Sequence, residues 1–260
     1  MEYKEIIKES YYHDNTGMLL KGDCLEVMKS FPDKSIDMIL CDLPYGTTAC
    51  KWDTIIPFEP LWDQYERIIK DNGAIVLTAS QPFTSALVMS NPNLFKYEWI
   101  WCKSKASDFI NANYRTMKKH ENILVFSKGN AAPGCNNKMI YNPQGIILKK
   151  SEKIRNGTLG IGRDRISQQG KYVSKGTNYP NSLLQISNEG KTIHPTQKPV
   201  ELFGYLIKTY TNKNDIVLDN AAGSCTTAIA CKNLNRRWIC IEQEEKYCDV
   251  SVERIKKVMK

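Results

Sequence analysis

Short apolar runs alternate with amphipathic segments along most of this chain, and this alternation restricts the fold more than any other feature. Buried strands are indicated at residues 18–23, 35–42, 73–80, 95–104, 121–129, 214–219 and 236–242. Helices are indicated at residues 24–32, 57–73, 82–90, 200–210, 224–235 and 244–260. Strands that alternate with helices favour a parallel sheet covered on both faces. We therefore predict an α/β fold with a doubly wound, mostly parallel, seven-stranded sheet.

The alternation stops in the middle of the chain. Residues 130–192 are rich in Gly, Asn, Lys, Ser and Gln and have little sustained periodicity. Such composition is typical of an insertion with short strands and long loops. We predict one domain in two halves, residues 1–128 and 193–260, with an inserted region at residues 129–192.

Charge is unevenly distributed along the chain. Residues 103–192 contain sixteen Lys and Arg and five Asp and Glu, a net charge of +11, whereas the whole chain carries +8. The remainder therefore carries −3. A basic segment on a mildly acidic frame favours a polyanionic partner such as nucleic acid. A Lys-rich solvated loop would have the same composition.

Cysteine and histidine usage gives little sign of a metal site. The nine cysteines form no CxxC pair, and the three histidines are scattered, which favours free thiols in a reducing compartment. No apolar run reaches the roughly 18 residues of a membrane helix, and the charged start of the chain lacks the apolar core of a signal peptide. We expect a cytoplasmic protein.

The strand at 35–42 leads into the stretch CDLPYG, residues 41–46. A polar turn that closes a sheet edge would explain these residues. Alternatively, the acid Asp42, a stiff backbone and the aromatic Tyr45 are presented together at the carboxyl end of a strand. Open α/β sheets bind their ligands at that edge.

A second strand end, IVLDNAAGSCTTAIA, has the pattern of a nucleotide-type site. The strand ends at Asp219, a loop of small residues contains Gly223, and the next strand ends at Glu242. A tight loop lets the backbone approach a ligand, and an acid on the next strand accepts hydrogen bonds from ribose hydroxyls. Because GxGxxG and GxxxxGK[ST] are absent, we favour an adenosine ligand without phosphates, such as S-adenosylmethionine. Packing of small residues is the simpler interpretation of this loop taken alone.

Taken together, several motifs resemble those of the β group of DNA amino-methyltransferases. These are LKGDCLEVMKSFPDKSIDMILCDLPYG, KWD, HENILVFSKG, HPTQKPVELFGYLI and VLDNAAGSCTTAIACKNLNRRWICIE. The resemblance covers most of the chain outside about 130–190. It implies a Rossmann-like methyltransferase sheet, S-adenosylmethionine as cofactor, and a DNA target-recognition region at residues 129–192.

The resemblance also implies roles for single residues. Asp42, Leu43, Pro44 and Tyr45 match the catalytic D-P-P-Y motif, in which the acid also lies beside the cofactor. The cofactor-binding set that it implies is Asp23, Asp42, His194, Thr196, Lys198, Asp219, Ala221, Gly223, Ser224, Thr226 and Glu242. No metal is implied, because the methyl donor is already activated.

Two departures from the family pattern bear on activity. Leu43 replaces the first proline of the catalytic motif, although its backbone carbonyl is retained. In the cofactor loop, Asn220, Ala221 and Cys225 replace Pro, Phe and Gly. Loss of the Phe removes an apolar contact, and Cys225 is expected to crowd the loop, so cofactor affinity is the property these changes affect.

For the chemistry, Asp42 and the Leu43 carbonyl are expected to accept the two hydrogens of a base amine. Tyr45 is expected to stack on the flipped base. Phe83 and Trp52 are weaker stacking candidates, and we expect Trp52 and Trp99 to pack in the core. The expected DNA contacts are Lys118, Lys119, Arg155, Arg163, Arg165 and Gln168.

The sequence therefore predicts a site-specific enzyme that methylates adenine N6 in double-stranded DNA. The alternatives are an N4-cytosine methyltransferase and a DNA-binding homologue with weak or no catalysis. Methylation of RNA or of a protein amide is less favoured, because Asn leads the motif there. Whether the protein is a dimer, and whether a restriction endonuclease accompanies it, stays open.

Overall fold

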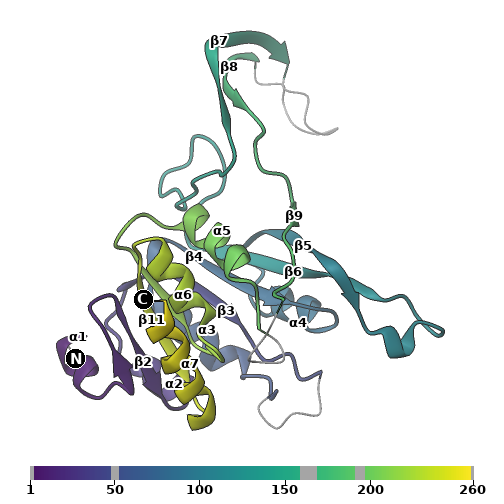
Figure 1. The fold of residues 1–260 in the computed structure, drawn as a ribbon. Coiled ribbons are helices and arrows are strands. Elements are labelled where there is room, and N and C mark those ends of the chain that lie inside the picture. Colours follow the sequence, from purple (N-terminus) through teal and green to yellow (C-terminus); the bar gives the residue numbers. More distant parts are fainter. Residues whose placement is uncertain (1–2, 48–52, 159–168, 191–196, 259–260) are drawn as a thin grey trace. The chain divides into compact units, whose positions relative to one another are not determined.

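The structure is a computed structural model that describes residues 3–47, 53–158, 169–190 and 197–258 (Figure 1). The chain forms two compact units, one of Met1–Asn142 with Ser182–Lys260 and one of Pro143–Asn181. The second unit lies within the predicted insertion and is shorter than it, because residues 129–142 and 182–190 belong to the first unit. The target-recognition role of residues 129–192 stays a prediction.

The first unit contains a mixed sheet of nine strands in the order β1-β2-β11-β10-β3-β4-β6-β5-β9. The strands are β1 (Tyr12–His13), β2 (Gly17–Lys21), β3 (Ile36–Asp42), β4 (Ile69–Ala79), β5 (Phe95–Ser107), β6 (Lys118–Ser127), β9 (Leu183–Gln185), β10 (Ile216–Asp219) and β11 (Arg237–Glu242). The seven inner strands correspond to the seven predicted ones. Two short edge strands, β1 and β9, are additional.

The predicted parallel character holds for the centre of the sheet. The strands β2, β11, β10, β3 and β4 pair in parallel, whereas β6 is antiparallel to both β4 and β5. From β3 the chain continues to β4 on one side, and from β10 it continues to β11 on the other. The carboxyl ends of β3 and β10 therefore flank the topological switch point, where open α/β sheets bind ligands.

Helices cover both faces of the sheet. They are α1 (Tyr3–Lys8), α2 (Cys24–Lys29), α3 (Phe58–Ile68), α4 (Phe83–Ser90), α5 (Val200–Tyr210), α6 (Thr226–Asn233) and α7 (Glu245–Lys257). Successive strand residues point to opposite faces. Thus Met38 and Leu40 of β3 pack with α5, α6 and α7, whereas Ile39 and Cys41 pack with α1 to α4. Figure 1 shows α6 and α7 on the near face.

One predicted boundary is wrong. The helix expected at 57–73 ends at Ile68, and β4 begins at once with Ile69, which pairs with Ile36. Gly73 is not a helix stop but a strand residue. A side chain there would come within 2.6 Å of the Asp37 carbonyl oxygen, so the close approach of β3 to β4 requires glycine.

Two other expectations, the burial of Trp99 and the free state of the cysteines, are confirmed. Trp99 is buried, and its indole nitrogen donates to the Tyr210 hydroxyl at 2.7 Å. The cysteines in the described part of the chain are free. The second unit, taken by itself, has an antiparallel pair of strands, β7 (Ile147–Thr158) and β8 (Gln169–Thr177). No helix within the described ranges is both long and apolar enough to span a bilayer.

Candidate active site

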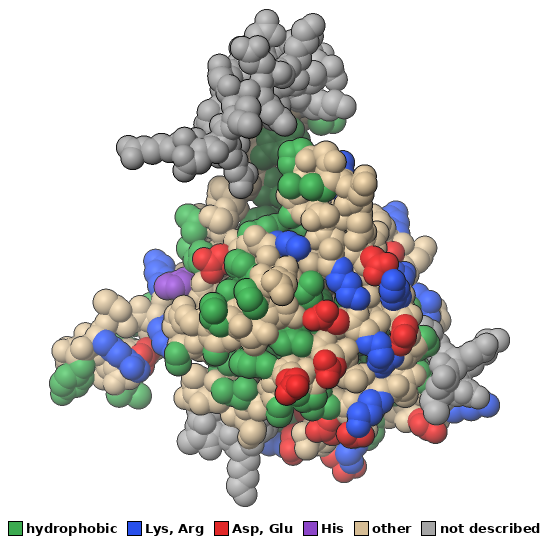
Figure 2. Space-filling model, turned by 180° about the vertical axis from the view of Figure 1, so that it is seen from behind, with side chains coloured by type: hydrophobic (Ala, Val, Ile, Leu, Met, Phe, Trp, Pro, Cys, Tyr) green, Lys and Arg blue, Asp and Glu red, His purple; other side chains and the backbone are tan. Residues whose placement is uncertain are grey.

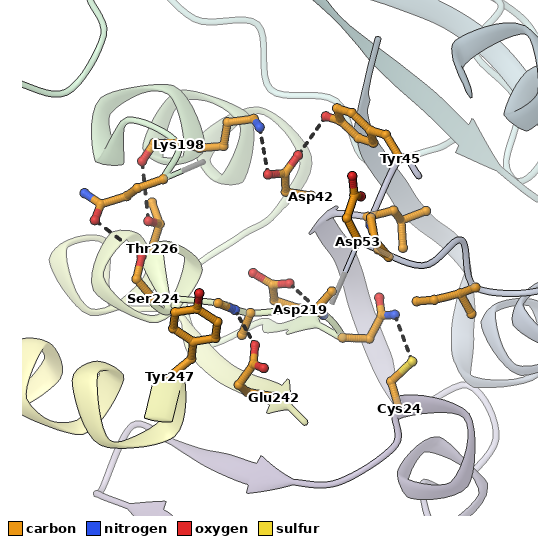
Figure 3. Close-up of a pocket in the computed structure, with 18 of the residues that line it drawn as sticks. Cys24, Asp42, Tyr45, Asp53, Lys198, Asp219, Ser224, Thr226, Glu242 and Tyr247 are labelled. Atoms are coloured by element: carbon orange, nitrogen blue, oxygen red, sulfur yellow. Dashed lines mark hydrogen bonds and ion pairs between the residues drawn. The ribbon is translucent and has the colours of Figure 1, made fainter. Parts of the chain in front are cut away.

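A cavity of about 790 Å³ opens at the carboxyl edge of the sheet, at the switch point (Figure 3). Strand order alone brings its acids together, because Asp42 ends β3, Asp219 ends β10 and Glu242 ends β11. Its lining includes these sequence-predicted residues: Asp23, Asp42, Leu43, Pro44, Tyr45, Lys198, Asp219, Ala221, Gly223, Ser224, Thr226 and Glu242. Segments far apart in sequence thus form one site.

Asp42 is held by neighbours on both carboxylate oxygens. The Tyr45 hydroxyl donates to Oδ1 at 2.7 Å, and the Thr78 hydroxyl, from the paired position on β4, donates to the same oxygen. The Lys198 ammonium lies 2.7 Å from Oδ2. The carboxylate therefore has a defined orientation at the cavity wall, and it retains lone pairs that can accept further hydrogen bonds.

Lys198 is shared between two carboxylates. Its ammonium also lies 3.3 Å from Glu121 Oε2, and Lys103 pairs with the other oxygen of Glu121 at 2.5 Å. Burial opposes the charged form of Lys198, but Asp42 and Glu121 outweigh it and raise the Lys198 pKa above its usual value. Lys103, Glu121, Lys198 and Asp42 therefore form a chain of alternating charges that ends at the predicted catalytic motif.

Tyr45 is the aromatic side chain of the catalytic motif, and its ring packs against Phe83. The two rings are stacked with centroids 5.2 Å apart, and Phe83, the first residue of α4, is buried in the core. Burial and the nearby Asp42 raise the Tyr45 pKa well above its usual value, so the hydroxyl stays protonated and donates. Phe83 thus supports Tyr45 from within the core. The stacking of Tyr45 on a base stays a prediction.

The cofactor loop, residues 219–226, is held by hydrogen bonds to buried residues of the core. Asp219 accepts from the Thr227 hydroxyl at 2.6 Å, and burial raises the Asp219 pKa to about 6. Asn220, which stands where the family has proline, accepts from the buried Tyr65 hydroxyl at 2.5 Å. This contact anchors the loop to α3, and it replaces the rigidity that a proline would provide.

Cys225 stands where the family has glycine, and it adopts a left-handed backbone with φ of 53°. Its side chain is fully buried in the core with α6 and α7. A non-glycine residue in this conformation costs roughly 1–2 kcal/mol. Cys225 therefore adds backbone strain within the cofactor loop, and it is not among the residues that line the cavity. Its effect on cofactor affinity stays a prediction.

Helix α7 holds the same loop from outside. One terminal nitrogen of Arg254 donates to the Ser224 carbonyl oxygen at 2.9 Å, the Ser224 hydroxyl at 3.0 Å and the Thr226 hydroxyl at 2.9 Å. Ser251 donates to the Gly223 carbonyl oxygen at 2.8 Å. Arg254 and Ser251 lie outside the motifs, so sequence reasoning missed them. The signal in the sequence was their spacing: residues three apart lie on the same face of a helix, so Ser251 and Arg254 could be expected to contact the same neighbour.

Glu242 and Asp23 occupy the positions implied for cofactor recognition and also have local partners. Glu242 accepts from the backbone N–H groups of Gly223 and Glu244 at 2.8 and 2.9 Å, and burial raises its pKa. Asp23 caps α2 by accepting from the backbone N–H of Leu25 at 2.8 Å. Both carboxylates line the cavity and keep lone pairs for a ligand.

The remaining predicted residues either lie outside the described part of the chain or are not among the described residues that line this cavity. His194, Thr196, Arg163, Arg165, Gln168 and Trp52 lie outside the described residues. Arg155 is in β7, but its side chain is not described, whereas Lys118 and Lys119 are exposed at the start of β6. Glu121 has no role predicted from the sequence, although the HENILVFSKG motif contains it. Across the described ranges, no cluster of three or more His, Cys, Asp or Glu is arranged for a metal ion.

Comparisons with known proteins agree with this geometry. The family model described as DNA methylase, for N6 and N4 methyltransferases, matches residues 36–253. The chain is 28% identical over 277 residues to the type II methyltransferase M.HinfI of Haemophilus influenzae, a match that covers 95% of this chain and 70% of that protein. It is 26% identical to the type II methyltransferase M.HpaI of Haemophilus parainfluenzae, with coverage of 91% and 73%.

Solved structures agree as well. The crystal structure of M1.HpyAVI in complex with SAM is similar, with a TM-score of 0.62, 26% identity, and coverage of 92% of this chain and 99% of that one. The PvuII cytosine-N4-specific DNA methyltransferase has a TM-score of 0.65 at 18% identity, with coverage of 96% and 93%, and supports the fold alone. Since the family model spans most of the chain and the motifs meet at one cavity, the chain belongs to the family of S-adenosylmethionine-dependent DNA methylases that act on adenine N6 or cytosine N4.

Proposed function

We propose that the protein transfers a methyl group from S-adenosylmethionine to the N6 amine of adenine at a specific sequence in duplex DNA. The observation that carries this proposal is the position of Asp42. Its carboxylate is oriented by Tyr45, Thr78 and Lys198, and it faces the same cavity as the cofactor loop and Glu242.

The residues of this cavity suit S-adenosylmethionine. A volume of about 790 Å³ lies within the roughly 300–1,000 Å³ of small-ligand sites. The carboxylates of Asp23 and Glu242 can accept from the adenosine part, and the small residues from Ala221 to Ser224 allow close approach of the backbone. Bound there, the cofactor supplies a methyl group on a positively charged sulfur, which needs no further activation.

The catalytic motif provides two acceptors for the target amine. The lone pair of a base amine is delocalised into the ring, so the nitrogen is a poor nucleophile until that pair turns out of the plane. Asp42 and the Leu43 carbonyl accept the two amine hydrogens, and both bonds strengthen as positive charge develops on nitrogen. Leu43 fulfils this role in place of proline because only its backbone carbonyl is used.

The choice of adenine rests on the first residue of the catalytic motif. In the family that this chain resembles, most enzymes with Asp at this position methylate adenine, and most with Ser methylate cytosine. The second candidate is cytosine N4, because the same carboxylate can accept a hydrogen from either amine. A catalytically weak DNA-binding homologue would follow if the altered loop at Asn220 to Cys225 prevented cofactor binding.

Double-stranded DNA is the proposed partner, and the basic segment 103–192 is its proposed contact surface. Within it, residues 129–192 are proposed to select the target sequence, with Arg155, Arg163, Arg165 and Gln168 as base or phosphate contacts. A homodimer and an accompanying restriction endonuclease are compatible with this function. Neither is required for the chemistry.

The test is nucleoside mass spectrometry of unmethylated DNA incubated with the purified protein and isotope-labelled S-adenosylmethionine. Labelled N6-methyladenine supports the proposal, and labelled N4-methylcytosine supports the second candidate. The variant Asp42→Ala is expected to abolish transfer while DNA binding is kept. Asp71→Ala is the matched control, because Asp71 is an exposed acid that pairs with Lys34 and does not line the cavity.

A further inference from the structure

A hairpin at the end of β5 and β6 exposes large apolar side chains. Residues 108–117 connect the two strands and include the short 3-10 helix Phe109–Asn111. Ile110 is 91% exposed, Tyr114 is 89% exposed and Phe109 is 77% exposed. Figure 1 shows this hairpin extending from the sheet, and Figure 2 shows an arm with hydrophobic and basic side chains at its end.

Polar contacts join the two sides of the hairpin tip at its base. Asp108 has a left-handed backbone with φ of 74° and accepts from Asn111 at 2.6 Å. Arg115, on the returning side, donates to the other Asp108 oxygen from Nε at 3.0 Å and from Nη2 at 2.8 Å. The exposed apolar side chains are therefore presented by an ordered turn. Grouped exposed apolar residues of this kind mark interaction sites.

The charge around the tip selects an anionic partner. Residues 104–120 contain four Lys and Arg and one Asp, and that Asp is neutralised by Arg115. Lys105, Lys118 and Lys119 are exposed and form no ion pair among the described residues. A partner for this surface must carry negative charge to pair with these ammonium groups, and it must also offer an apolar space for the exposed side chains.

The tip of the hairpin starts directly after a residue that lines the cavity. Ser107, the last residue of β5, lines the same cavity as Asp42, together with Lys103 and Glu121 from the two hairpin strands. Phe109 and Ile110 follow Ser107 by only two and three residues. A duplex whose target base entered the cavity would therefore bring its neighbouring base pairs within reach of the tip.

We propose that Phe109 and Ile110 form a wedge that enters the DNA stack beside the target base and fills the space that the base leaves. This inference rests on the proposed function and adds to it the residues that open the duplex. DNA-bending proteins insert Phe, Ile, Leu or Met side chains between base steps in the same manner. Lys105, Lys118 and Lys119 hold the flanking phosphates, which keeps the tip in register with the target.

The experiment compares methyl transfer to two DNA substrates that contain the mapped target site. One is a normal duplex, and in the other the target base lies opposite an abasic position, so little pairing resists its extrusion. The double variant Phe109→Ala, Ile110→Ala is expected to lose at least tenfold in kcat/KM on the normal duplex and less than threefold on the abasic duplex. Met89→Ala, on α4, is the matched control, because Met89 is a 72% exposed apolar residue that is not part of the hairpin.

Two further readouts distinguish a wedge from a tip that supports the fold or a dimer. Cofactor affinity and thermal unfolding of the double variant should equal those of the wild type, because the exposed tip supports neither the cavity nor the core. Equal losses on both substrates, or no loss on either, would overturn the wedge. So would a wild-type dimer that becomes a monomer in the double variant, since the tip would then bind a second copy of the chain. If the wild type itself methylates no DNA, the proposed function fails first and the wedge fails with it.

Discussion

Lys198 carries a positive charge that two carboxylates, Asp42 and Glu121, hold in common. Replacing Glu121 by Gln removes one of them and leaves Lys198 paired with Asp42 alone. We expect the Lys198 pKa to fall, and the Lys198 ammonium, held by one carboxylate instead of two, to orient Asp42 less firmly. Methyl transfer should drop by about tenfold, the effect of roughly 1.4 kcal/mol.

The pH dependence tests this positioning role of Glu121. Because Glu121 raises the Lys198 pKa, transfer by the wild type should stay level between pH 8 and 10, whereas transfer by Glu121→Gln should decline as Lys198 loses its proton. Glu98→Gln on the neighbouring strand β5 is the matched control, because Glu98 is exposed and bonds Asn122 instead. Parallel pH profiles for the wild type and Glu121→Gln would contradict the role.

Asp219 is a buried acid whose ionisation costs stability. Its folded-state pKa is raised by burial from 3.8 to about 6, so the folded state binds the proton more tightly than the unfolded state does. The stabilisation is complete below the unfolded pKa and is lost as the pH rises through about 6. The loss amounts to about 3 kcal/mol at most, from a shift of about two units.

Removing the titrating group should therefore flatten the pH dependence of stability. Relative to Asp219→Asn, the wild type is expected to lose unfolding free energy between pH 4 and pH 7. Urea unfolding of both proteins across that range measures the difference. Curves that run parallel through pH 6 would mean that Asp219 is already ionised at pH 4.

At the scale of elements, α7 holds the cofactor loop through Arg254. Arg254→Lys keeps the charge but loses the planar group that contacts Ser224 and Thr226 together. We expect about tenfold weaker binding of S-adenosylmethionine by calorimetry, with little change in thermal stability. Lys257→Gln, an exposed change in the same helix, is the control and should leave the affinity unaltered. Unchanged affinity in Arg254→Lys would show that the loop keeps its shape without α7.

The elements also mark where periodicity is an unreliable guide. The apolar residues of the segment 57–73 fit a helical period, which predicts a helix that extends to Gly73. In the structure the helix ends at Ile68 and β4 begins at Ile69. The pairing of Ile69 with Ile36 outweighs the local preference for a helix. The strands β5 and β6 were predicted, but β5 extends beyond residue 104 to Ser107 and β6 begins before residue 121 at Lys118, because these polar strand ends resemble loop sequence.

At the scale of the whole molecule, charge should govern DNA affinity. Each phosphate contact contributes a slope of roughly −0.9 to the dependence of log affinity on log salt concentration. The double variant Lys118→Gln, Lys119→Gln should therefore reduce the slope by up to about 1.8 in anisotropy titrations. Lys208→Gln with Lys213→Gln, two exposed lysines outside the basic segment, should leave the slope unchanged. Equal slopes for all three proteins would exclude Lys118 and Lys119 as phosphate contacts.

By itself, the sequence determined the class of fold and the acids of the site. Asp42, Asp219 and Glu242 each end an apolar run, and parallel strands bring such ends to one edge of a sheet. Local pattern is sufficient for these residues, because each position depends only on its own strand. The family motifs then connected the strand ends to a methyl transfer reaction.

Only the tertiary structure decided which side chains support those acids. Glu121 reaches Lys198 because β6 runs antiparallel beside β4, and Arg254 reaches the cofactor loop because α7 packs against its turn. The turn at Asp108, which presents Phe109 and Ile110, likewise depends on Arg115 from the far side of the turn, before β6 begins. Such contacts join residues that are distant in sequence or separated by a turn, so they depend on strand order and register, which no local pattern contains.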